Sequence, residues 1–98
     1  MEVRYEDSEL ERLESDPSFR GKWSQSVVKA FRKRMQAIRA ATDERAFYQM
    51  KSFHFEKLAG NRRHQRSMRL NDQFRLILKF EGKSPDKTVV VISIEDYH

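Results

Sequence analysis

The clearest periodic pattern of apolar side chains lies in the first half of the chain. Apolar residues recur there at spacings of four, four, four and three positions: Trp23, Val27, Phe31, Met35 and Ile38. Such spacing places side chains on one face of a helix, so the pattern predicts one long amphipathic helix over residues 18–41. Basic residues occupy the other faces of this segment: Lys29, Arg32, Lys33, Arg34 and Arg39.

Two shorter elements are predicted before this helix. Residues 2–5 fit a first strand, and Ser8 followed by Glu11 matches a capping box, in which both side chains satisfy backbone N–H groups at a helix start. The helix that begins there carries two apolar residues on one face, Leu10 and Leu13. We expect it to end at the Asp-Pro pair of residues 16–17, because the residue before proline disfavours the helical conformation.

The pattern changes after the long helix. Thr42 and the acidic pair that follows it predict the start of a short helix that reaches about Met50. After Gly60 the apolar period becomes two, which is typical of strands. Residues 64–70 are predicted to form a strand, and the Asn-Asp pair at 71–72 predicts the turn that follows it.

Two further strands are predicted near the end of the sequence. Over residues 74–80 the apolar side chains alternate with a largely polar face, on which Arg75 points away from the core and could contact a ligand. The segment EGKSPD predicts a hairpin loop, and a final strand follows with apolar residues in alternation: Val90, Ile92 and Ile94. The order of elements predicts an α+β fold in one domain, residues 1–98. An N-terminal strand and the helices would pack on one face of a small, mainly antiparallel sheet that ends in a β-meander.

Composition excludes several classes of protein. The 98 residues suffice for one domain and contain no cysteine, which excludes a disulfide framework and a thiolate zinc site. No apolar run approaches the roughly 18 residues of a membrane span, and the charged start MEVRYEDSEL does not resemble a signal peptide. We therefore expect a cytoplasmic protein that is not bound to a membrane.

The net charge of +5 conceals an asymmetry along the chain. Residues 1–18 carry seven acidic and two basic side chains, a net charge of −5, so residues 19–98 carry +10. Clustered Lys and Arg side chains bind polyanions by displacing counterions from phosphate. A solvated basic surface without a ligand would have the same composition, so charge alone does not decide between these interpretations.

The candidate chemistry centres on the histidines, which all lie in the second half of the chain: His54, His64 and His98. Their spacing does not match a metal-binding helix motif, and the sequence contains neither the nucleophile elbow of a serine hydrolase nor a glycine-rich phosphate loop. We therefore expect no metal site. RNA, however, can be cleaved without a metal when a base, an acid and cations surround the phosphodiester.

Histidine titrates near neutral pH and can serve as the acid or the base, and Lys57 and Arg75 could supply the cations. Each residue also has a simpler interpretation. Lys57 could be a solvated loop residue, and Arg75 could pair with an acidic residue across adjacent strands, Glu95 or Asp96. His64 could be an exposed strand residue and His98 a frayed chain end.

Residues 52–98 resemble a known family. The segment SFHFEKLAGNRRHQRSMRLNDQFRLILKF, followed by VVVISIEDYH, is similar to the RelE/ParE toxin superfamily, and to its HigB branch in particular. The similarity rests on three motifs: His54-Phe-Glu-Lys57, Phe74-Arg75 and Asp96-Tyr97-His98. The terminal Glu-Asp-Tyr-His is the most specific of them. The sequence departs from the family pattern in three places: Phe stands at position 74 where Trp is usual, Leu-Ala is inserted before Gly60, and the hairpin at 81–87 is longer than usual.

The resemblance implies the toxin of a type II toxin–antitoxin pair, a ribosome-dependent endoribonuclease that cleaves mRNA and leaves a 2′,3′-cyclic phosphate without a cofactor. His98 would be an acid or base, Lys57 and Arg75 would bind and stabilise the scissile phosphate, and His54 would assist catalysis or hold the site. Asp96 and Tyr97 would orient the substrate or His98.

Four further basic residues are expected to bind RNA: Arg62, Arg63, Arg66 and Lys79. The expected partners are the ribosome, mRNA and an antitoxin, a small helix-turn-helix protein that would form a hetero-oligomer with this chain. Two alternatives remain open: a ParE-like toxin that inhibits gyrase, and an RNA-binding module without catalysis. A ParE-like binding toxin needs no acid/base pair, and an RNA-binding module would leave the terminal Asp-Tyr-His motif unexplained.

Overall fold

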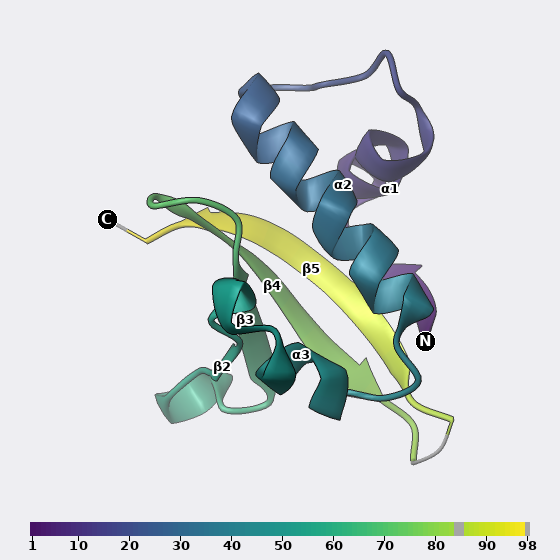
Figure 1. Ribbon diagram of the computed structural model, residues 1–98, viewed down its shortest axis with the longest axis vertical. Coiled ribbons are helices and arrows are strands. Elements are labelled where there is room, and N and C mark those ends of the chain that lie inside the picture. The colour runs from purple at the N-terminus through teal and green to yellow at the C-terminus, as the bar shows by residue number, and fades with distance from the viewer. Residues whose placement is uncertain (84–85, 98) are drawn as a thin grey trace.

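In the computed structural model, helices cover one face of a twisted sheet (Figure 1). The structure describes residues 1–83 and 86–97. Within these ranges the elements are β1 (Glu2–Tyr5), α1 (Ser8–Ser15), α2 (Gln25–Ala40), α3 (Arg45–Gln49), η1 (Lys51–Phe53), β2 (Glu56–Lys57), η2 (Gly60–Arg62), β3 (Gln65–Arg69), β4 (Phe74–Glu81) and β5 (Thr88–Asp96), where η denotes a 3-10 helix.

The described strands form one five-stranded sheet in the order β1-β5-β4-β3-β2. β1 pairs with β5 in parallel, and the other neighbours are antiparallel. The predicted α+β fold with a C-terminal β-meander is therefore confirmed. The segment between α3 and β3, for which the sequence predicted no element, contains η1, the short edge strand β2 and η2.

The long helix α2 begins at Gln25, seven residues later than predicted. Ser24 caps it, with Val27 N donating to the Ser24 hydroxyl at 3.4 Å. The preceding segment cannot continue the helix, because Gly21 has a left-handed φ of +57° and Arg32 binds the carbonyl oxygens of Asp16 and Phe19, both at 3.0 Å. Trp23, predicted inside the helix, lies before it and packs edge-on against Phe74.

Two predicted helix starts were also wrong in detail. Asp7 and not Ser8 caps α1, because the Asp7 carboxylate accepts from Glu9 N at 2.9 Å. The capping residue of α3 is Glu44, without a side-chain bond, and not Thr42. In each case the helix starts within three residues of the predicted position.

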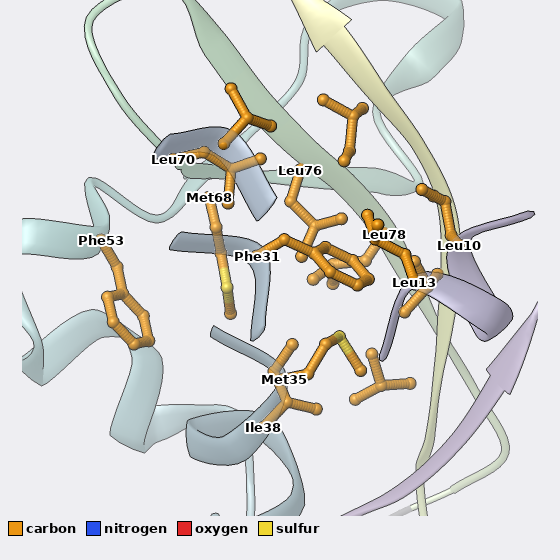
Figure 2. Close-up of a cluster of buried hydrophobic side chains, with 14 of the residues drawn as sticks. Leu10, Leu13, Phe31, Met35, Ile38, Phe53, Met68, Leu70, Leu76 and Leu78 are labelled. Carbon is orange, nitrogen blue, oxygen red and sulfur yellow. The ribbon is translucent and has the colours of Figure 1, made fainter. Parts of the chain in front are cut away.

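The core lies between the helices and the sheet (Figure 2). Phe31, Met35 and Ile38 of α2 are fully buried, as the four-residue spacing predicted. They pack in one cluster with residues of α1 and of the sheet, including Leu10, Leu13, Met68, Leu76 and Leu78. Within β4 the predicted alternation is confirmed, because Leu76 and Leu78 belong to this cluster whereas Ile77 does not.

A β-bulge changes the face assignment of β5. The pairing with β4 shifts between Ile77 and Leu78, which lie opposite Ser93 and Val91. Ile92 is therefore the extra residue of a bulge. The β5 residues in the core are Val89, Val91 and Ile94. Strict alternation from the sequence would place Val90, Ile92 and Ile94 on the core face. This is wrong for Val90 and Ile92, because alternation does not anticipate a bulge.

The sheet face opposite the helix layer is covered by charged side chains. Val90 and Ile77 are fully buried although they lie outside the helix-side cluster. Three ion pairs cross this face: Arg4–Glu81 at 2.9 Å, Lys79–Glu6 at 3.1 Å and Arg62–Glu95 at 2.8 Å. Long side chains can cover apolar surface with their stems while their charged ends stay in solvent.

Candidate functional site at the end of the sheet

A pocket of about 360 Å³ opens at the end of the sheet where the β3–β4 turn meets the end of β5. Figure 1 shows this turn beside the C-terminal end of β5. The pocket is lined by six residues: His54, Arg69, Asn71, Asp72, Arg75 and Tyr97. Three of them were predicted from the sequence, namely His54, Arg75 and Tyr97, and these come from three segments far apart in the chain.

Arg75 lies in this pocket and is only 9% exposed. Its Nε donates to the Ser67 hydroxyl at 2.9 Å, and its Nη2 donates to the carbonyl oxygens of Ser67, at 3.4 Å, and of His54. The ring of Tyr97 lies 5.2 Å from the guanidinium carbon. The sequence placed Arg75 on an uncovered face. The face is correct but the exposure is not, because the His54 loop, β3 and Tyr97 enclose the side chain.

His54 occupies an unusual backbone conformation. Its φ of 44° and ψ of 52° lie in the left-handed region, which a residue with a side chain adopts at a cost of order 1–3 kcal/mol. Its neighbours Phe53 and Phe55 are both buried in the core, and Arg75 binds its carbonyl oxygen. These contacts over-determine the turn and leave the imidazole exposed at the pocket.

The end of β3 and the β3–β4 turn supply the three lining residues that the sequence did not predict for the site: Arg69, Asn71 and Asp72. The Asn71 side chain accepts from Gln73 N at 2.9 Å and from Phe74 N at 2.8 Å, which closes the turn. Arg69 donates to the Asp72 carboxylate and to the Asn71 carbonyl oxygen. A signal for Arg69 was present, because strands that flank a short turn bring it opposite Arg75, the register that the structure has.

The pocket is electrostatically suited to an anion. Arg69 and Arg75 lie on one sheet face, and Asp72 is the acidic residue in its lining. A third arginine supports the turn, because Arg34 Nε donates to the Arg69 carbonyl oxygen at 2.9 Å. Burial lowers the pKa of Arg34, and the positive charge of Arg69 lowers it further. An anion in the pocket would relieve this repulsion.

The two described residues of the terminal motif, Asp96 and Tyr97, have different surroundings. Tyr97 follows the strand and is held by a bond from its backbone N–H to the Gln73 carbonyl oxygen at 2.7 Å. Asp96 is opposite Phe74 in register, on the helix-side face, and accepts from the Gln73 side chain at 3.0 Å. Asp96 therefore does not line the pocket with Tyr97. His98 lies outside the described residues, as does part of the predicted 81–87 hairpin loop, at 84–85.

Lys57 is exposed on the edge strand β2, opposite Arg66 of β3, and is not among the residues that line the pocket. Its side chain belongs to the other sheet face from Arg69 and Arg75, because Arg66 pairs with Leu78. The Leu-Ala insertion before Gly60 follows Lys57 directly.

The four basic residues expected to bind RNA have different environments. Arg63 is exposed, whereas Lys79 pairs with Glu6 and Arg62 pairs with Glu95. Arg66 Nη1 donates to the carbonyl oxygens of Arg63 and Gln65, both at 3.2 Å. Two of the four charges are therefore already neutralised by carboxylates within the protein.

The described part of the chain contains no group of three or more acidic, histidine or cysteine side chains that could hold a metal ion. None of its helices has the length and apolar character needed to cross a membrane.

Helices on one face of a small mixed sheet, with a basic pocket at the end of its last strand, define a RelE-like toxin fold. The structure is similar to that of the YoeB/ParE toxin from Agrobacterium tumefaciens, with a TM-score of 0.62 over 100% of both chains at 15% sequence identity. In sequence, residues 3–98 match the family described as RelE-like toxin of type II toxin-antitoxin system HigB. The chain belongs to this HigB-like toxin family, whose type II systems imply an antitoxin partner. The comparison with curated proteins gives no match.

Proposed function

We propose that this toxin is a ribosome-dependent endoribonuclease that cleaves mRNA in the ribosomal A site by acid/base chemistry. RelE-like toxins of the HigB family are generally endoribonucleases, which supports the reaction class. The observation that carries the proposal is the pocket, where the buried Arg75 guanidinium, Arg69 and the exposed His54 imidazole meet.

Arg75 and Arg69 are the proposed phosphate ligands. A guanidinium presents its N–H groups in a fixed fork that matches phosphate oxygens. Arg75 is rigid because Ser67 and His54 hold it, so little side-chain entropy is lost when a phosphate binds. Arg69 is paired with Asp72, and an RNA phosphate would compete with that carboxylate.

The proposed reaction is an intramolecular displacement at phosphorus. The 2′-hydroxyl oxygen attacks the adjacent phosphate while a base takes its proton. The bond from phosphorus to the 5′-oxygen then breaks, and an acid gives the leaving oxygen a proton. The products are a 2′,3′-cyclic phosphate and a 5′-hydroxyl, and the arginine cations stabilise the extra charge of the intermediate.

We assign the acid and base roles to His54 and His98 without an order, since either imidazole can serve in either role. Tyr97 lies over Arg75 and would orient the RNA or the terminal histidine. Lys57 retains its proposed role as a cation for the phosphate only if β2 moves toward the pocket on the ribosome. For Asp96 the proposed role is to orient the end of β5 through Gln73.

The decisive experiment measures single-turnover cleavage of mRNA on saturating ribosomes by His54→Gln and His98→Gln. Both should fall by about 10²–10⁴-fold with an unchanged melting temperature, because general acid/base catalysis supplies that factor. His64→Gln is the matched control, since His64 is exposed and does not line the pocket. A rate within about threefold of the wild type for both variants would contradict the assignment. Inhibition of gyrase without mRNA cleavage would favour the ParE-like alternative.

The proposed partners follow from the same function. The antitoxin would be a small helix-turn-helix protein that forms a hetero-oligomer with the toxin, and the substrate complex would be the cytoplasmic ribosome with its mRNA. Copurification of the toxin with the product of the adjacent gene, and its loss when that gene is deleted, would test the antitoxin assignment.

A further inference from the structure

We propose that Arg62 is a positioning residue: it holds the Glu95 carboxylate away from Arg75 and thereby keeps the Arg75 guanidinium available to an RNA phosphate. This inference rests on the proposed function, since it concerns the phosphate ligand of the same site. It assigns Arg62 an action through another residue, in place of the direct RNA contact expected from the sequence.

The guanidinium of Arg62 is held by residues of two strands, β3 and β5. The side chain leaves η2 and donates from Nε to the Gln65 amide oxygen on β3 at 2.9 Å. Its Nη1 and Nη2 donate to the two Glu95 carboxylate oxygens on β5, at 3.0 Å and 2.8 Å. Because β4 lies between β3 and β5, the side chain crosses β4 on the face opposite the helices. This bidentate pair lowers the pKa of Glu95.

Without Arg62, Glu95 would have another cation beside it. Arg75 of β4 and Glu95 of β5 lie directly opposite each other in the antiparallel register. Side chains at such positions have Cβ atoms about 4.5–5.5 Å apart, and opposite charges there attract. In the structure the two do not pair. Arg75 turns toward β3 and the His54 loop, and Glu95 turns to Arg62 and to the Ser93 hydroxyl at 3.0 Å.

The separation matters because Arg75 retains donor capacity for a ligand. Its protein bonds use Nε and Nη2, and within the described residues Nη1 makes no hydrogen bond. A Glu95 carboxylate bound to Arg75 would cancel the charge that attracts phosphate. Of the other acidic groups near the pocket, Asp72 is in the lining but binds Arg69, and Asp96 is on the helix-side face.

A double-mutant cycle distinguishes this electrostatic role from simple support of the strand. The variants are Arg62→Met, Glu95→Gln and the two combined. In Arg62→Met the Glu95 carboxylate is free to pair with Arg75. The Kd for inorganic phosphate should therefore rise about tenfold or more. Phosphate binding is followed by the NMR shift of the Arg75 Nε–H. The KM for mRNA-programmed ribosomes should rise by a similar factor, with a smaller change in kcat.

The combined variant gives the critical result. It lacks the Arg62 bonds and also the competing carboxylate, so phosphate affinity and KM should return to within about threefold of the wild type. If Arg62 served only to hold the end of β5, the combined variant would stay as weak as Arg62→Met, and the inference would be overturned. An unchanged phosphate affinity in Arg62→Met would overturn it equally.

A matched control and an independent readout complete the design. Arg4→Met removes another arginine–carboxylate pair on the same sheet face, in which Arg4 Nη2 donates to both Glu81 oxygens at 2.9 Å and 3.0 Å, and should leave phosphate binding unchanged. The phosphate titration needs no ribosome. If the wild type failed to cleave mRNA, the proposed function would fall while the titration still decided whether Arg62 controls the Arg75 anion site.

Discussion

Replacing Arg75 with Lys separates the charge of the site from its hydrogen-bonded geometry. The variant keeps a cation in the pocket but loses the planar fork that binds Ser67 and His54 together. We expect it to be folded, less stable than the wild type, and less able to hold the His54 turn.

The magnitude follows from the contacts that one ammonium group cannot reproduce. Ser67 is fully buried, so loss of the bond from Arg75 Nε leaves its hydroxyl unsatisfied at a cost of about 1–3 kcal/mol. Loss of the bond to the His54 carbonyl oxygen costs about 1 kcal/mol more. The same loss removes the support of the strained left-handed turn at His54. The free energy of unfolding should therefore fall by about 2–4 kcal/mol.

The assay is urea unfolding followed by Trp23 fluorescence and by far-ultraviolet circular dichroism, with the midpoint compared at an unchanged m-value. Arg4→Lys on the same face serves as the control and should change stability by less than about 0.5 kcal/mol, since its pair with Glu81 is half exposed. A second comparison uses Ser67→Ala alone and with Arg75→Lys. The two changes should couple by at least about 0.5 kcal/mol because they remove the same bond. Additive effects, or a loss below about 0.5 kcal/mol for Arg75→Lys, would refute the reasoning.

Three further predictions test the core, the pH dependence and the basic surface. Phe31→Ala removes a fully buried ring and should cost about 3–5 kcal/mol in urea unfolding; a loss under about 1 kcal/mol would contradict the core assignment. Arg39 holds the pKa of Glu14 below its usual value, so this stabilisation is present above the unfolded-state pKa and is lost as the pH falls through the lower folded-state pKa. Glu14→Gln should therefore flatten the stability profile on its acid side, below about pH 5, and an unchanged slope there would exclude the effect. Ribosome affinity measured by cosedimentation should fall steeply with added salt, and an affinity flat up to physiological salt would remove phosphate binding by the basic surface.

The fold could be predicted from the sequence because its elements follow local periodicity. The four-residue spacing of Val27, Phe31 and Met35 and the alternation in β4 each reflect one buried face, and both are confirmed. The errors occur where a tertiary contact overrides the local pattern. Gly21 and the bonds from Arg32 delay the start of α2, and the bulge at Ile92 reverses the faces of part of β5.

The candidate site was only partly accessible from the sequence for a related reason. A sequence motif identifies single residues and not their neighbours in space. The motifs identified three of the six residues that line the pocket. They could not show that Lys57 and Arg75 belong to opposite sheet faces, because the β2–β3 register depends on a two-residue strand that has no periodic signal. Nor could they show that Arg69 and Asp72 line the pocket, since these residues lie at the end of β3 and in the turn after it, where the only sequence signal was the Asn-Asp pair.

The basic composition gave the least reliable guide, because a charge contributes to phosphate binding only if the fold leaves it available. Lys79 and Arg62 are two of the four residues expected to bind RNA, and both are paired with carboxylates on the sheet face opposite the helices. An RNA phosphate would have to displace these carboxylates, so the two residues should contribute little to counterion release. Arg63 is exposed and Arg75 has one unoccupied nitrogen among its described contacts. The salt dependence of RNA binding should therefore fall by about one unit of slope for Arg63→Gln, and stay nearly constant for Lys79→Gln.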